Sequence, residues 1–228
     1  MISKTRIWPK LAVLLFVSGA VMRAATPTLI QHVSCSNTQG INVGTYTCPF
    51  PNSTLDSNAI VVGFQFADGQ GVTNVAVSDN VGNSYTIISN SDGNQIANVA
   101  YAIGTTSGVA SVTITFNGGS SVGRWVAATI SEFNNITAID GSDVNSDAGS
   151  TVTTGPITPT ASGDLFYLYA INDNPGYCYS WSAGPGGTLL SSDWIDGQVA
   201  QYTIYNSSDP IVPTLSQSIT PAIGMPFL

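Results

Sequence analysis

The stretch Ala110-Ser-Val-Thr-Ile-Thr-Phe116 alternates apolar and hydroxyl side chains. Val112, Ile114 and Phe116 fall on one side of an extended chain, because successive side chains of a β-strand point to opposite faces. The intervening Ser and Thr residues fall on the other side. The stretch therefore predicts a strand with one buried face and one hydrated face.

The same period of two continues in both directions from this stretch. We expect further strands at 28–35, 43–48, 59–66, 72–78, 84–89, 96–103, 124–133, 151–157, 164–171, 198–205 and 211–219. Turn sequences such as Asn80-Val-Gly-Asn83 and Gly184-Pro-Gly-Gly187 separate them. Residues 59–66 and 164–171 are almost continuously apolar, which indicates central strands covered on both faces, or one core face and one subunit contact.

About a dozen short strands at this spacing predict an all-β fold, a single antiparallel β-sandwich of the immunoglobulin-like or jelly-roll kind. We expect one domain over residues 26–228. The acidic stretch Asp140–Gly149 offers an alternative, a waist between two halves.

Basic residues are concentrated at the start of the chain, where Lys4, Arg6, Lys10 and Arg23 precede or flank the apolar run 11–17 and the small residues up to Ala25. This is the pattern of a secretory signal peptide, expected over residues 1–25, with cleavage after Ala20 as the alternative. The apolar run is shorter than the roughly 20 residues that span a bilayer. The sequence therefore predicts a secreted, extracellular or cell-surface protein without membrane insertion.

After residue 25 the chain has one basic residue, Arg124, against thirteen acidic residues, a formal net charge of −12. Phosphate backbones are bound through many lysines and arginines, so we expect no nucleic-acid partner. An anionic membrane surface is excluded for the same reason. The absence of lysine from this part of the chain also excludes Schiff-base chemistry.

The segment Val75-Ala-Val-Ser-Asp-Asn-Val-Gly-Asn-Ser-Tyr-Thr86 resembles the V-x-D-x-x-G-N-x-Y-T hairpin of a widespread group of secreted bacterial β-sandwich domains. Tyr101-Ala, Glu132-Phe133 and Gly163-Asp-Leu165 follow in the same order, so the resemblance covers most of residues 29–228. It implies an immunoglobulin-like or jelly-roll module of surface or matrix-associated proteins. It brings no catalytic residues.

The three cysteines favour one disulfide. Cys35 and Cys48 would lie close together if strands 28–35 and 43–48 form a hairpin, whereas Cys178 is far away in the sequence. We expect a Cys35–Cys48 bond and a free Cys178, with pairings of Cys178 to either other cysteine or to a second chain as alternatives.

Asp143, Asn145 and Asp147 place three oxygen ligands at alternate positions ahead of Gly149, as at the start of a calcium loop. The glycine comes one residue late and no glutamate follows at the twelfth position. A hydrated acidic loop is the alternative. We expect no cofactor other than this candidate calcium ion.

Tyr177, Tyr179 and Trp181 share one face of an extended segment, and Trp194 could extend that surface. A flat aromatic row can stack against sugar rings, which predicts a glycan-binding platform. Packing of the same row in a core, or against a subunit, is the alternative.

Glu132 is the only glutamate and continues the apolar side of its strand. A buried carboxylic acid could serve a glycosidase if Asp140 or Asp164 supplied the second carboxylate. The alternative is a strand-end carboxylate that bonds the backbone.

The sequence as a whole favours a non-catalytic extracellular protein that acts by surface contact, in a structural, assembly or adhesion role. Its partners would be extracellular glycans or protein subunits, including self-association through strand edges, for which the segment Thr26–Ile30 could donate a strand. A carbohydrate-binding module is the second hypothesis and a glycoside-active enzyme the third.

Overall fold

The computed structural model describes residues 25–36, 44–67, 71–91, 95–118, 126–144, 151–159, 162–171, 177–192, 197–207 and 209–221, which form fourteen strands and no helix. The strands are β1 (Thr28–Ser36), β2 (Thr45–Pro49), β3 (Ala59–Ala67), β4 (Asn74–Asp79), β5 (Thr86–Ser91), β6 (Gln95–Ala102), β7 (Ser111–Asn117), β8 (Val126–Asn134), β9 (Thr151–Thr153), β10 (Asp164–Ile171), β11 (Tyr177–Ala183), β12 (Thr188–Ser192), β13 (Gln198–Tyr205) and β14 (Thr214–Pro221). Every pairing among them is antiparallel. The predicted all-β class is confirmed.

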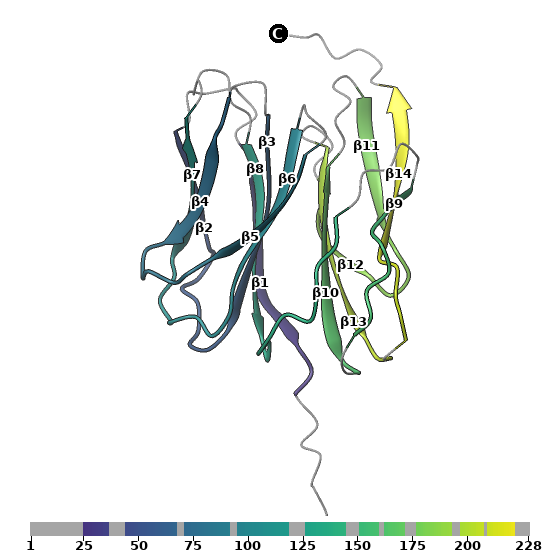
Figure 1. Ribbon diagram of the computed structural model, residues 1–228, viewed down its shortest axis with the longest axis horizontal. Coiled ribbons are helices and arrows are strands. Elements are labelled where there is room, and N and C mark those ends of the chain that lie inside the picture. The colour runs from purple at the N-terminus through teal and green to yellow at the C-terminus, as the bar shows by residue number, and fades with distance from the viewer. Residues whose placement is uncertain are drawn as a thin grey trace, which may run out of the picture.

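The strands form four separate sheets that lie in four successive layers (Figure 1). Sheet 1 has the order β2-β7-β4, sheet 2 β1-β8-β3-β6-β5, sheet 3 β10-β13-β12 and sheet 4 β11-β14-β9. Sheets 1 and 2 enclose one hydrophobic core and sheets 3 and 4 another. The predicted single sandwich is therefore not confirmed, because the described strands form two sandwiches, built from β1–β8 and from β9–β14.

The core of the first sandwich is made by the alternation seen in the sequence. Val112, Ile114 and Phe116 of β7 are buried, while the Ser and Thr residues between them lie on the outer face of sheet 1. Phe66 meets Phe116 edge to face across the core, with ring centroids 5.0 Å apart. Burying a side chain of this size contributes about 1.5–3 kcal/mol. The prediction for residues 110–116 is confirmed.

Sheet 2 is covered on both faces because it lies between sheets 1 and 3. Its central strands β3 and β8 are accordingly buried along almost their whole length, as the apolar run 59–66 indicated. The other apolar run, β10, is also covered on both faces, by sheets 2 and 4. It was predicted to be a central strand, but among the described strands it pairs only with β13. It therefore lies at the edge of sheet 3.

The two sandwiches pack against each other through the facing sides of sheets 2 and 3, a contact that we call the seam. Phe133 of β8 meets the rings of Tyr167 and Tyr202, with centroids 6.4 and 5.5 Å apart. A Cβ atom on Gly63 would lie 2.2 Å from the ring of Tyr169, so the ring can reach β3 only because that position is a glycine. The seam thus depends on close fit at particular residues.

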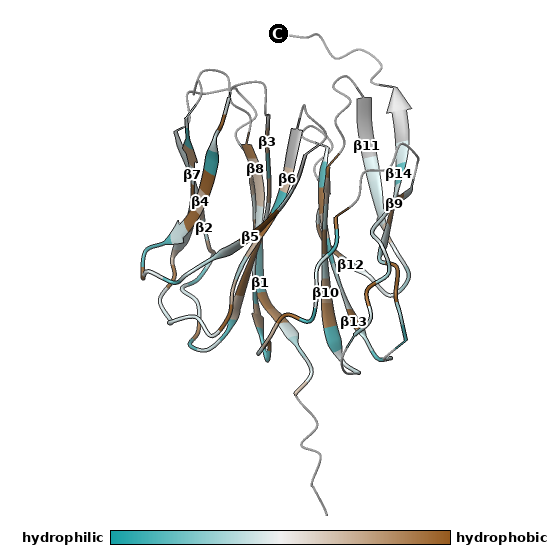
Figure 2. Ribbon diagram, in the orientation of Figure 1, coloured by the Kyte–Doolittle hydropathy of each residue, from teal (hydrophilic) through white to brown (hydrophobic). Residues whose placement is uncertain are grey.

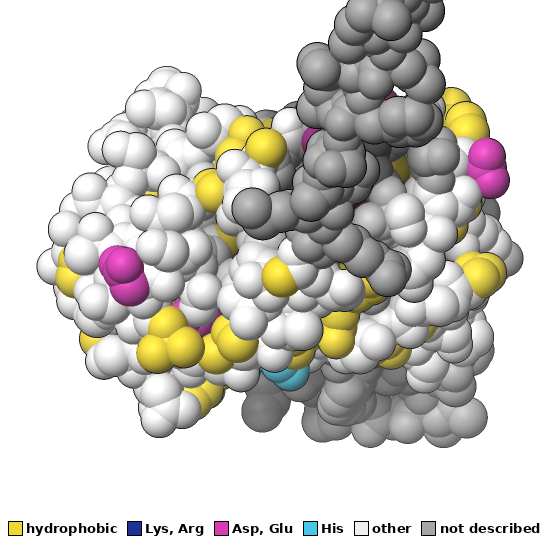
Figure 3. Space-filling model, turned by 90° about the horizontal axis from the view of Figure 1, so that it is seen from below, with side chains coloured by type: hydrophobic (Ala, Val, Ile, Leu, Met, Phe, Trp, Pro, Cys, Tyr) yellow, Lys and Arg dark blue, Asp and Glu magenta, His cyan; other side chains and the backbone are white. Residues whose placement is uncertain are grey.

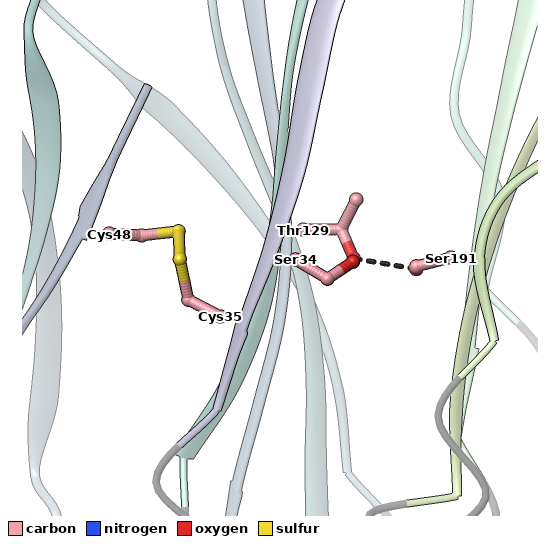
Figure 4. Close-up of a disulfide and its surroundings, with 5 residues drawn as sticks. All are labelled: Ser34, Cys35, Cys48, Thr129 and Ser191. Atoms are coloured by element: carbon pink, nitrogen blue, oxygen red, sulfur yellow. Dashed lines mark hydrogen bonds between the residues drawn. A yellow bond between two sulfur atoms is a disulfide. The ribbon is translucent and has the colours of Figure 1, made fainter. Parts of the chain in front are cut away.

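The disulfide between Cys35 and Cys48 is present, with the two Cα atoms 5.8 Å apart. The predicted hairpin is wrong: β1 pairs with β8 and β2 pairs with β7, so the bond joins sheet 2 to sheet 1 across the first core. Figure 4 shows Cys35 pointing from β1 toward Cys48 and its neighbour Ser34 pointing to the opposite side, toward the seam. Alternate side chains of β1 therefore face the first core on one side of sheet 2 and the seam on the other.

Replacing Cys48 by alanine should lower the free energy of unfolding of the first sandwich by about 3 kcal/mol in the loop-entropy account. Thiol labelling of the unfolded, unreduced protein should modify Cys178 and leave Cys35 and Cys48 unmodified. Peptide mapping that found Cys178 in a disulfide would contradict this expectation.

Candidate functional site

The motif expected to form a hairpin is instead a turn that joins β4 of sheet 1 to β5 of sheet 2, and the carboxylate of Asp79 organises it. Its Oδ1 accepts hydrogen bonds from the backbone N–H groups of Val81, Gly82 and Asn83 at 3.0, 2.7 and 3.2 Å. Its Oδ2 accepts from Asn83 Nδ2 at 2.8 Å and from the Tyr85 hydroxyl at 3.0 Å. Gly82 has φ of 88°, a left-handed conformation that glycine adopts without strain. The spacing of Asp79, Gly82, Asn83 and Tyr85 is thus explained by one hydrogen-bonded turn.

The same turn is tied to the neighbouring loop between β6 and β7. Asn80 donates from Nδ2 to the Gly108 carbonyl at 3.0 Å and accepts from the Ala110 N–H at 2.7 Å. The Thr106 N–H donates to Asn83 Oδ1 at 2.9 Å. These contacts fix two loops at one end of the first sandwich, which is a structural role.

Asp79 should make the stability of the protein depend on pH. Burial raises the pKa of Asp79, but the hydrogen bonds from Asn83, Val81 and Tyr85 outweigh this effect and hold it below its ordinary value of 3.8. A lowered pKa means that the ionised form stabilises the fold above the unfolded value, and that this contribution is lost as the pH falls through the folded value. Urea unfolding of the wild type and Asp79→Asn should therefore differ most at neutral pH and converge under strongly acidic conditions.

The matched control for this prediction is Asp56→Asn, since Asp56 is exposed and, among the described residues, accepts only from the neighbouring Ser57 hydroxyl. Its unfolding curve should follow that of the wild type at both pH values. A difference between wild type and Asp79→Asn that stays constant from neutral to acidic pH would contradict the assignment.

Glu132 is fully buried at the same end of the first sandwich, and three donors hold its carboxylate. Oε1 accepts from the Leu55 N–H at 2.7 Å and from Asn58 Nδ2 at 2.6 Å, while Oε2 accepts from Gln31 Nε2 at 2.7 Å. Gln31 and Asn52 exchange two further bonds, so the network fastens the loop before β3 to β1 and β8. This geometry fits the alternative of a carboxylate bonding the backbone, and without exposed surface Glu132 cannot reach a glycoside in this conformation.

Trp181 of the predicted aromatic row is not exposed on the surface. Its indole is 6 % exposed and packs with Leu168, Val199 and Leu215 in the core between sheets 3 and 4. The predicted place of Trp181 in a ligand-binding surface is therefore corrected. Period-two spacing shows which residues share a face of a strand but does not show which face is covered. The side chains of Tyr177 and Tyr179, and the whole of Trp194, lie outside the described residues.

The candidate calcium loop is described only at Asp143. Its exposed carboxylate accepts a hydrogen bond from the Gly155 N–H. Asn145 and Asp147 lie outside the described residues, so calcium binding stays a prediction. Asp140 is exposed and Asp164 half-buried, and each lies on a segment other than the loops that hold Glu132.

The outermost faces of the stack carry hydroxyl side chains in register across neighbouring strands. On sheet 1, Thr47 stands beside Thr113, with their hydroxyl oxygens 3.0 Å apart, and Thr113 stands beside Ser78. On sheet 4, Ser182, Ser216 and Thr151 form a corresponding row. The outward positions with hydroxyl groups are Thr45, Thr47, Ser78, Ser111, Thr113 and Thr115 on sheet 1, and Thr151, Thr153, Ser180, Ser182, Ser216 and Ser218 on sheet 4.

The described outward-facing positions of the strands in sheets 1 and 4 carry no charged side chain. The described residues as a whole contain no lysine or arginine. Figure 2 shows the described parts of β11 and β14 of sheet 4 in pale or hydrophilic colours. Figure 3 shows the lower side of the stack, where the described side chains are mostly uncharged, with a few acidic groups and one histidine. Sequence reasoning noticed the hydroxyl positions of β7 but not that they continue across a whole sheet, because strand register is not visible in the sequence.

The beginning of the chain, including the predicted signal peptide, lies outside the described residues. Within the described ranges, the structure contains no helix that is long and apolar enough to cross a bilayer. The disulfide is compatible with the predicted extracellular location. Comparisons of the chain with protein-family models, with curated proteins and with solved structures returned no match.

Proposed function

We propose that this is a secreted, non-catalytic protein that acts by surface contact, in a structural, assembly or adhesion role at the cell exterior. The observation that supports this most is the pair of uncharged hydroxyl faces on sheets 1 and 4. Solvated sheet faces of ordinary proteins carry interspersed charged residues that oppose association. Short hydroxyl side chains present donors and acceptors without that opposition.

The geometry of these faces suits an extended partner. Neighbouring strands lie about 4.7–4.9 Å apart, and residues on the same face of one strand repeat about every 6.6–6.8 Å. The hydroxyl groups consequently form a two-dimensional array, of which Thr47, Thr113 and Ser78 are one row. Such an array can make many weak hydrogen bonds at once, and desolvating a hydroxyl costs far less than desolvating an ion.

The two faces lie at opposite ends of the four-layer stack (Figure 1). One molecule can therefore contact two partners at the same time, which is the property that a structural or adhesive protein needs. The partners that fit are uncharged surfaces rich in hydrogen-bonding groups, of which other protein subunits are the first candidate. The burial of Trp181 removes the central residue of the predicted glycan platform, so the glycan hypothesis no longer rests on that residue.

The mature protein should be tested on a panel of glycoside substrates and on a glycan array. We expect no turnover of any substrate, and unchanged results for Glu132→Gln. Hydrolysis that disappears in Glu132→Gln would overturn the non-catalytic proposal. Glycan binding that is lost in Trp181→Ala without loss of folding would favour the carbohydrate-binding module instead.

A further inference from the structure

The seam has fewer fully buried apolar residues than either core. They are Phe133, Tyr169, Leu190 and Ala200, against fourteen in the first sandwich and five in the second, and nine partly buried apolar residues pack around them. Thr129 and Ser131 of β8 and Gln198 of β13 are also completely buried there. Polar groups at a buried contact reduce its stability unless each finds a partner.

Two of these polar residues have a buried group that lacks a hydrogen-bond partner in the described part of the chain. The Ser131 hydroxyl and Gln198 Nε2 are buried without a hydrogen-bond partner among the described residues, although Gln198 Oε1 accepts from Tyr169 at 2.8 Å. Burial raises the pKa of Tyr167, and the nearby Ser131 hydroxyl and Gly63 backbone offset this effect only in part. When the seam opens, these polar groups can form hydrogen bonds with water. This gain offsets part of the free energy that is lost when the apolar residues of the seam become exposed.

Each sandwich is complete without the other. Sheets 1 and 2 contain only strands β1 to β8, and sheets 3 and 4 only β9 to β14, so no described strand pairs across the seam. The first sandwich also has its own disulfide and its own hydrogen-bond networks around Asp79 and Glu132. Opening the seam therefore leaves both cores and all described strand pairings intact.

The two sandwiches are joined by the 16 residues 135–150. A chain of this length can extend to about 50 Å, several times the 10 Å spacing of packed sheets. It is long enough for the second sandwich to reach a neighbouring molecule while the chain stays continuous. The surface it would meet there is the face of sheet 2 that it already fits, with Gly63 under Tyr169 and Thr129 beside Ser191.

We propose that this face of sheet 2 can bind the second sandwich of another copy of the chain. Molecules then assemble by domain swapping, in which each seam forms between sandwiches of different molecules. Exchange of an identical element adds no new interface and is a low-cost route to dimers or open chains. The inference rests on the proposed assembly function and names its partner and surface. The acidic net charge of the chain opposes such assembly at low ionic strength and less so at physiological salt.

The test is a disulfide engineered across the seam in the full mature chain, Thr129→Cys with Ser191→Cys in a Cys178→Ser background. The hydroxyl oxygens of Thr129 and Ser191 are 2.7 Å apart, so sulfur atoms there come within bonding reach. Two preparations carrying tags of different size are mixed at rising concentration, oxidised and separated without reductant. Thr129 is completely buried, so a bond between molecules at this position requires an opened seam.

We expect covalent dimers containing both tags, in a proportion that rises with protein concentration before oxidation. Bonds that form only within single molecules, up to the highest soluble concentration, would overturn the proposal. As a second measurement, the thiol of Thr129→Cys alone should react with a labelling reagent faster than the protein unfolds globally. Labelling only at the rate of global unfolding would also overturn it.

Gly63→Ala is the control that disturbs the seam itself, and it should abolish both the internal and the exchanged bond. The result is distinguishable from a failure of the proposed contact function, because the outer faces of sheets 1 and 4 take no part in the seam. A protein that never exchanges could still act through those faces.

Discussion

Replacing Glu132 by alanine is expected to lower the free energy of unfolding of the first sandwich by about 3–5 kcal/mol, since each unsatisfied buried donor costs about 1–3 kcal/mol. The substitution leaves Gln31 Nε2, the Leu55 N–H and Asn58 Nδ2 without their acceptor, at a site where Asn58 is buried and the other two bonds are partly buried. Urea unfolding of the mature protein measures the change. The loop before β3 should also lose protection from hydrogen exchange.

Glu132→Gln is the matched variant, because it keeps the size of the side chain and one acceptor oxygen while turning the other position into a donor. Glu132→Gln should lower the free energy of unfolding by less than Glu132→Ala does. Asp209→Ala, which removes an exposed carboxylate bonded only to Ser207, should change stability by less than about 0.5 kcal/mol. A Glu132→Ala protein as stable as the wild type would show that the buried network does not hold this end of the sandwich.

Replacing Gly63 by alanine is expected to separate the two sandwiches. The added Cβ would lie within 2.2–2.9 Å of three atoms of the Tyr169 ring, which real contacts do not allow. Overpacking of this kind costs about 1–3 kcal/mol, and the Tyr169 ring or the strands on either side of the seam must move to relieve it. Small-angle scattering should show a more extended molecule, while circular dichroism keeps the β-sheet spectrum of both sandwiches.

A second substitution can restore the contact if the clash is its cause. Gly63→Ala combined with Tyr169→Leu removes the ring that collides and should recover the compact scattering profile in part. Gly44→Ala is the control, since nothing lies within 4 Å of its Cβ position, and it should leave the profile unchanged. A compact Gly63→Ala protein would contradict the role given to this glycine.

The sequence was informative where a property is local. Alternation along residues 110–116 correctly predicted one buried and one hydroxyl face, and the Asp-Gly-Asn-Tyr spacing correctly predicted a turn. The Cys35–Cys48 bond was also predicted, but for a wrong reason, because the two strands belong to facing sheets and not to a hairpin. Strand β12 was missed, since its five residues follow directly on a Gly-Pro-Gly-Gly turn and look like loop.

The arrangement of sheets could not be read from the sequence because it depends on pairings between distant strands. β3 and β10 both show two apolar faces, and this follows from stacking four layers, which a single sandwich would not require. The importance of Gly63 was also invisible, since only the ring of Tyr169, more than a hundred residues away, reveals it. Trp181 illustrates the same limit, because its strand could have turned either face to the core.

The central claim is that the uncharged outer faces make the contacts through which the protein works. Thr47→Glu with Thr113→Glu on sheet 1, and Ser182→Glu with Ser216→Glu on sheet 4, place paired charges on these faces. The matched control is Ser53→Glu with Ser107→Glu, which adds the same charge at exposed loop positions. The measurement is retention of the secreted protein on the exterior of the cells that produce it, after washing.

We expect both outer-face variants to lose retention by at least about tenfold, equivalent to about 1.4 kcal/mol, while the loop control is retained like the wild type. Unfolding curves should show that all three variants remain folded under the conditions of the assay, although repulsion between cross-strand glutamates lowers the stability of the outer-face variants somewhat. Equal retention of the outer-face variants and the loop control would contradict the claim that these faces make the contacts.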